Sequence, residues 1–151
     1  MRARALFYLV VCFSFWFADA RSVPANQKPC TTAEEKQALD EADHLKDWNA
    51  VHRSFIRFSH CDNGAIAEGY SDTVGRLLAY DWGQIGILAK LIAPDDKFES
   101  FVLRHIDETL PTDMLKAITS NAKKSCPVGG TALCLKILRR TQLADGVAST
   151  G

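Results

Sequence analysis

Glu68, Asp72 and Arg76 are the polar side chains whose spacing points most directly to chemistry. Residues four apart lie on one face of a helix, so the stretch 64–80 presents the two carboxylates and the guanidinium as a row. Two carboxylates divide the acid and base roles of glycoside hydrolysis when they flank a cleft, which defines one hypothesis, a small hydrolase. The plainer interpretation is a solvated stripe in which Asp72 pairs with Arg76. A partly buried stripe would instead form a polar binding surface, with Tyr70 as its aromatic anchor.

His105 is the histidine best placed for acid–base chemistry. It shares the apolar face of an expected helix with two phenylalanines. A histidine there serves as a general base in a pocket or, more commonly, lies at the edge of the core with a hydrogen-bond partner. Asp107 follows closely but is expected to point elsewhere on the same helix. His44, His52 and His60 recur every eight residues, which does not place them on one helix face, so we predict no metal site.

Four cysteines remain once the N-terminal segment discussed below is removed, and an even number in an exported chain favours disulfides. Cys30 precedes the first expected helix and Cys61 follows the second. These helices have similar lengths, about 15 and 13 residues, so an antiparallel hairpin brings both cysteines to the same end. Cys126 and Cys134 flank a short turn and close it similarly. We predict the bridges Cys30–Cys61 and Cys126–Cys134, since no zinc-type spacing competes with them.

Other catalytic patterns are missing from the sequence. It contains no G-x-S-x-G nucleophile motif and no glycine-rich phosphate loop after a strand, and no mature cysteine stays free once both bridges form. We therefore expect no bound cofactor.

The stretch that carries these candidates, 64–80, is predicted to be a central helix with neighbours on about three sides. Read in steps of four, it separates into an apolar row and a row of small residues. The apolar row is Ile66, Tyr70, Val74 and Leu78, and the small row is Ala67, Ser71, Gly75 and Ala79. Small side chains let another backbone come close, which offsets the roughly 1 kcal/mol that an interior glycine costs a helix.

Capping residues and apolar spacing predict further helices on both sides of this one, and no segment shows the period-two alternation of a strand. They are expected at about 31–46, 47–60, 81–93, 95–106, 111–124 and 131–143. In the first, Leu39 and Leu45 are expected to face the core. Asp47-Trp48 and Asp81-Trp82 lie 34 residues apart, the period of tetratricopeptide repeats, but the later positions of that repeat are not matched in the first unit. The predicted fold is all-α, with about seven helices as stacked antiparallel hairpins, either a short α-solenoid or an orthogonal bundle.

The first 20 residues are typical of a secretory signal peptide. Arg2 and Arg4 precede an apolar run, and an A-x-A cleavage site ends at Ala20. A retained membrane anchor is the alternative, but the run is shorter than the roughly 20 residues that span a bilayer. We predict a secreted or periplasmic protein with no stable membrane span after cleavage. The expected divisions are the signal peptide 1–20, a lead-in 21–30, one helical domain 31–143 and a flexible tail 144–151.

Charge narrows the class of partner. Of 18 basic and 18 acidic residues, 16 and 17 remain after cleavage, so the mature net charge is −1. Nucleic-acid binders need a net basic surface, which disfavours that class. The favoured hypothesis is a non-catalytic module that binds a protein partner through Glu68, Tyr70, Asp72, Arg76 and His105. Two alternatives stay open: the small hydrolase, using Glu68, Asp72 or His105, and a carrier of a small apolar ligand.

Overall fold

The chain folds into packed helices. A computed structural model describes residues 28–42 and 44–148, and the predicted signal peptide lies outside them. The described residues form seven α-helices, two short 3₁₀ turns and no strand, which confirms the predicted all-α class. The α-helices are α1 (Thr32–Ala42), α2 (Trp48–Phe58), α3 (Gly64–Tyr80), α4 (Ile85–Ile92), α5 (Asp96–Arg104), α6 (Thr112–Lys124) and α7 (Thr131–Ala148). None of them combines the length and hydropathy needed to cross a lipid bilayer.

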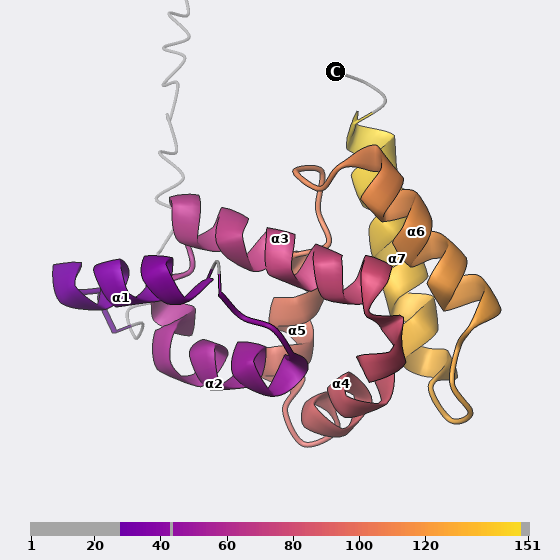
Figure 1. The fold of residues 1–151 in the computed structure, drawn as a ribbon, viewed down its shortest axis with the longest axis horizontal. Coiled ribbons are helices and arrows are strands. Elements are labelled where there is room, and N and C mark those ends of the chain that lie inside the picture. The colour runs from indigo at the N-terminus through magenta and orange to yellow at the C-terminus, as the bar shows by residue number, and fades with distance from the viewer. Residues whose placement is uncertain (1–27, 43, 149–151) are drawn as a thin grey trace, which may run out of the picture.

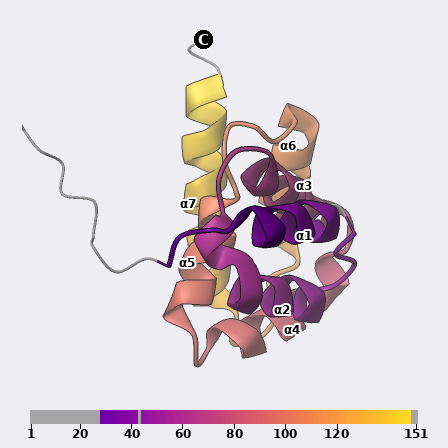
Figure 2. The same ribbon diagram turned by 90° about the vertical axis from the view of Figure 1, so that its left-hand side faces the viewer.

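Helix α3 is the central element. It packs against α1 on one side and α6 on the other, and α6 pairs with α7 (Figures 1 and 2). Its apolar row is buried as predicted, with Tyr70 and Val74 both 0% exposed. The small row gives close approach: a Cβ on Gly75 would lie 2.5 Å from the sulfur of Met114 and 2.7 Å from a methyl of Leu110. A larger side chain at position 75 would therefore push these residues off α3.

Side-chain hydrogen bonds to helix ends hold the neighbours of α3 in place. The Thr73 hydroxyl donates to the carbonyl of Ala42, the last residue of α1, over 3.0 Å. The Asn121 amide on α6 donates to the carbonyls of Leu78 and Ala79, at 3.0 and 2.9 Å. Carbonyls at a helix C-terminus have no partner within the helix, so these bonds satisfy them while joining α3 to α1 and α6.

Both predicted disulfides are confirmed. Cys30, just before α1, is bonded to Cys61 in the 3₁₀ turn after α2, with the two Cα atoms 5.0 Å apart. Cys126 is bonded to Cys134 across the turn between α6 and α7, with a Cα separation of 6.1 Å. The first bridge therefore closes the α1–α2 hairpin, and the second closes the α6–α7 hairpin.

Helix α1 ends earlier than its sequence pattern predicts. The expected helix continues to about 46, whereas α1 ends at Ala42. The His44 ring lies 2.8 Å from the carbonyl of Asp40, where a continuing helix would place the His44 backbone N–H. Leu45, which follows the end of α1, is 3% exposed and faces the core as predicted. Leu39 was also predicted to face the core, but it is 42% exposed.

The start of the fourth helix and the end of the last one also differ from prediction. The segment Trp82–Gln84 is a 3₁₀ turn that precedes α4 at Ile85, and the Gln84 side chain bonds Asp81 rather than capping an α-helix. Helix α7 continues to Ala148, beyond the predicted end at 143. Ala144 is 3% exposed, so the start of the predicted flexible tail is helical and packed.

Candidate functional site

A buried polar network joins the turn before α3, the middle of α3 and the end of α5. His105, the residue after α5, is 2% exposed, and Ser71 on α3 is 3% exposed. The Ser71 hydroxyl oxygen lies 3.0 Å from Nδ1 of His105. On the other side of the ring, Nε2 lies 3.3 Å from Oδ2 of Asp62, whose side chain is 5% exposed. The network thus joins residues 62, 71 and 105 through one imidazole.

Asp107 completes the network and fixes the direction of its hydrogen bonds. The Ser71 hydroxyl donates to Oδ2 of Asp107 over 2.9 Å. A hydroxyl has one proton to donate, so the bond between Ser71 and His105 must run from Nδ1–H to the Ser71 oxygen. Asp107 also accepts from the backbone N–H of Thr109 at 2.9 Å. Asp107 was expected to point elsewhere on a helix with His105, but α5 ends at Arg104 and the chain turns Asp107 back toward α3.

The two carboxylates of the network are held in their charged form. Burial would raise the pKa of Asp62, but the neighbouring His105 and Arg104 outweigh it and place this pKa below its ordinary value. Burial likewise opposes ionisation of Asp107, and hydrogen bonds from Thr109 and Ser71 bring its pKa below the ordinary value. A buried carboxylate with a lowered pKa destabilises the folded protein when its partners are removed, because its charge is then left unpaired.

The order of carboxylate, imidazole and hydroxyl resembles a nucleophilic triad, but its geometry opposes that chemistry. In a working triad the imidazole accepts the proton of the serine hydroxyl. Here the Ser71 proton lies on the bond to Asp107, and the Ser71 oxygen accepts from His105. Ser71 is also buried in the middle of α3, where backbone N–H groups are bonded within the helix and cannot stabilise an oxyanion. The network therefore acts as a structural link between three segments.

Glu68 and Asp72 are exposed on α3 and line a groove with three residues of the loop between α5 and α6. The loop residues are Thr109, Leu110 and Pro111. No hydrogen bond or ion pair engages either carboxylate among the described residues. These two predicted residues thus share one surface, which we call the acidic groove.

Arg76 and Tyr70 are placed differently from the predicted surface. The Arg76 guanidinium is half-buried and donates to the carbonyl of Leu45 over 2.6 Å, and no ion pair joins it to Asp72 within the described chain. Tyr70 is fully buried, and its hydroxyl shares a 2.8 Å hydrogen bond with Ser54. Burial raises the pKa of Tyr70. Tyr70 is therefore a core residue and does not reach a partner at the surface.

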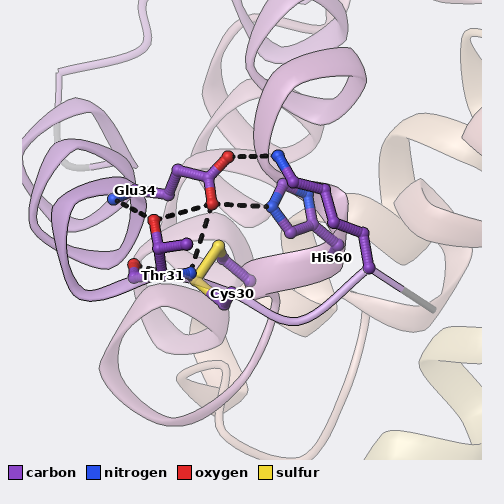
Figure 3. Close-up of polar contacts among 6 residues, drawn as sticks. Cys30, Thr31, Glu34 and His60 are labelled. Atoms are coloured by element: carbon purple, nitrogen blue, oxygen red, sulfur yellow. Dashed lines mark hydrogen bonds and ion pairs between the residues drawn. A yellow bond between two sulfur atoms is a disulfide. The ribbon is translucent and has the colours of Figure 1, made fainter.

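A second polar cluster surrounds the Cys30–Cys61 bridge. The Glu34 carboxylate accepts from the hydroxyl of Thr31 at 2.8 Å and lies 3.5 Å from Nε2 of His60 (Figure 3). The Thr31 and Glu34 bonds form the predicted capping box at the start of α1. Bonds from Lys28 and Thr31 lower the pKa of Glu34 to about 2. The sequence spacing of the histidines did not reveal this cluster, because Glu34 and His60 meet only through the hairpin.

Comparisons with known proteins give no family or relative. No family model, curated protein or solved structure matches this chain. Any statement about function therefore depends on the chemistry of the sites described above.

Proposed function

We propose that this chain is an exported, non-catalytic binding module whose acidic groove binds a basic segment of a protein partner. The observation that carries the proposal is the pair of exposed carboxylates, Glu68 and Asp72, which no described side chain neutralises. They lie one helical turn apart on α3, beside the wall formed by Leu110 and Pro111.

The chemistry of this groove favours a cation. Side chains four residues apart on a helix have Cβ atoms roughly 5–6 Å apart, so both carboxylates can approach one lysine or arginine side chain, and the planar fork of an arginine can bond both. The apolar wall beside them suits the aliphatic part of the same side chain. A basic peptide segment satisfies both requirements, whereas an anionic ligand would be repelled.

The rest of the fold supports binding rather than catalysis. In the buried network, the Ser71 hydroxyl donates its proton to Asp107 and is therefore not activated as a nucleophile by His105. Two disulfides are consistent with an oxidising, extracytoplasmic compartment, where a small domain gains stability from such bridges.

The test compares two matched double variants of the mature protein. Glu68→Gln with Asp72→Asn removes the charge of the groove, and Glu35→Gln with Asp40→Asn removes the same charge from the exposed side of α1. Each immobilised protein is incubated with the extracytoplasmic fraction of the organism that produces it. Captured proteins are identified after chemical cross-linking through carboxylates and lysines.

We expect the wild-type protein and the α1 variant to capture the same protein, cross-linked to Glu68 or Asp72, and the groove variant to lose it by at least about tenfold, the equivalent of one 1.4 kcal/mol contact. Raising the salt concentration should weaken capture, because the contact is an exposed ion pair. Equal capture by both variants, or cross-links confined to other surfaces, would contradict the proposal.

A further inference from the structure

Four side chains of metal-binding types meet where the α1–α2 hairpin is closed. One ligand atom each from Glu34, His60 and Cys61 lies within 4.8 Å of the others, and Cys30 is bonded to Cys61. Figure 3 shows the Glu34 carboxylate and the His60 ring beside the Cys30–Cys61 disulfide. We propose that a thiol reductant that opens this disulfide creates a Zn²⁺ site formed by Cys30, Cys61, His60 and Glu34. This inference does not depend on the acidic groove.

The positions of the nitrogen and oxygen ligands already suit zinc. Zn–S distances of about 2.3 Å and Zn–N or Zn–O distances of about 2.0–2.2 Å in a tetrahedron imply ligand atoms roughly 3.3–3.8 Å apart. Nε2 of His60 and Oε2 of Glu34 are separated by 3.5 Å. His60 Nε2 is also a buried atom that makes no hydrogen bond, so no hydrogen bond has to be broken for the neutral ring to bind a metal through this nitrogen.

The hydrogen bonds around Glu34 are compatible with this role. The Thr31 hydroxyl and backbone N–H donate to Oε2, and Lys28 pairs with the other oxygen, Oε1. A metal on Oε2 leaves the Lys28 contact in place and replaces one of the two Thr31 bonds, because a carboxylate oxygen has two lone-pair sites; the remaining Thr31 bond holds the carboxylate in its orientation. Such bonds to a ligating carboxylate raise the metal affinity of natural sites.

The disulfide controls the site because its sulfurs are ligands only as thiolates. When the disulfide is closed, only Glu34 and His60 can act as ligands, whereas structural zinc sites have four. Cys61 is fully buried and Cys30 is partly exposed, so a dithiol reductant attacks the sulfur of Cys30 and Cys61 leaves as the thiolate.

The second thiol of the reductant then displaces Cys30 from the mixed disulfide. Two electrons pass from the dithiol to the protein, the reductant ends as a disulfide, and its two thiol protons end on the two cysteine sulfurs. Zn²⁺ displaces these two protons into water. The loaded site contains two thiolates, one carboxylate and a neutral imidazole.

The experiment titrates the mature protein with Zn²⁺, and separately with Co²⁺, before and after reduction. A phosphine reductant is used, which opens both disulfides, takes oxygen from water and leaves no competing thiol. We expect one metal per chain only after reduction, and thiolate-to-cobalt charge-transfer absorption in the cobalt form. Zn²⁺ should protect Cys30 and Cys61 from alkylation and leave Cys126 and Cys134 reactive.

Variants distinguish a zinc site that includes His60 and Glu34 from incidental binding of zinc by the thiols alone. His60→Gln and Glu34→Gln should each lower the Zn²⁺ affinity of the reduced protein at least about tenfold, since even groups that only orient a ligand have effects of that size. The exposed neighbours provide controls: His44→Gln and Glu35→Gln should leave the affinity unchanged.

Circular dichroism measures whether reduction unfolds the protein. Helix content should either survive reduction or return when Zn²⁺ is added. Metal uptake by the oxidised protein, no uptake by the reduced one, equal effects of the test and control variants, or helix loss that Zn²⁺ fails to reverse would each overturn the proposal.

Discussion

Replacing Asp62 with asparagine should expose the energetic role of the buried network. The substitution keeps the shape of the side chain and removes its charge. The Asp62 and His105 side chains are 5% and 3% exposed, so water cannot replace the lost interaction. Asp62 forms ion pairs with His105 and Arg104 at this buried site. Interactions with a charged group contribute about 1.5–3 kcal/mol, so we expect Asp62→Asn to lower the free energy of unfolding by that amount. Arg104, which also pairs with Asp62, is 58% exposed, so Arg104→Gln should cost at most about 1 kcal/mol.

The loss should depend on pH in a defined direction. The pKa of Asp62 in the folded protein lies below its ordinary value of 3.8: burial opposes ionisation, but His105 and Arg104 outweigh it. Stability from such a group is fully present above the unfolded pKa and is lost as the pH falls through the folded one. At pH 5 the unfolding free energy of the wild type should therefore exceed that of Asp62→Asn by the full amount, and this difference should shrink below about pH 4.

Urea denaturation followed by tryptophan fluorescence measures these free energies. A double-mutant cycle with His105→Gln should give a coupling energy with Asp62→Asn of at least about 1 kcal/mol, because the two residues are in contact. The reasoning is refuted if the loss is the same at pH 5 and pH 3, or if Arg104→Gln costs as much as Asp62→Asn.

Three further variants test the packing of α3, the glycine in α4 and the C-terminal hairpin. Gly75→Leu should destabilise the protein by about 1–3 kcal/mol, because the added side chain meets α6. Gly86→Ala has open space around its Cβ and should stabilise the protein by up to about 1 kcal/mol. Thermal unfolding distinguishes these opposite effects. Replacing Cys126 and Cys134 together with alanine opens a bridge of sequence separation 8 and should lower the urea-derived unfolding free energy by about 2.5 kcal/mol, with no loss indicating that the bridge does not constrain the unfolded chain.

Local signals were sufficient to predict the helices and the bridges. The capping box of Thr31 and Glu34 and the rows of α3 depend on residues three and four apart, where sequence spacing maps directly onto geometry. The ends of helices were less predictable. The termination of α1 depends on the His44 ring competing for the carbonyl of Asp40, a contact that the apolar pattern does not report.

The buried network could not be predicted from the spacing of residues along the sequence. His105 was correctly singled out as a residue of interest, but its partners Ser71 and Asp62 lie 34 and 43 positions earlier in the chain. Contacts of this kind are set by how α5 packs on α3. A weak signal existed: Ser71 is the one polar member of the row of small residues on a helix expected to be enclosed, and a buried hydroxyl requires a partner.

The same reasoning explains the mixed result for the surface residues. Glu68 and Asp72 are exposed together because they share a face of α3 that no helix covers within residues 28–42 and 44–148. Arg76, one turn further on, has a side chain long enough to reach the Leu45 carbonyl in the turn after α1, and so it leaves the row.

The most direct test of the account is native-state hydrogen exchange of the backbone amides of α3, since the core, the buried network and the acidic groove all depend on this helix. We expect the amides from Tyr70 to Leu78 to exchange only through global unfolding, and thus to be among the slowest in the protein. Exchange of these amides as fast as that of the first turn of α1 would contradict the central position assigned to α3.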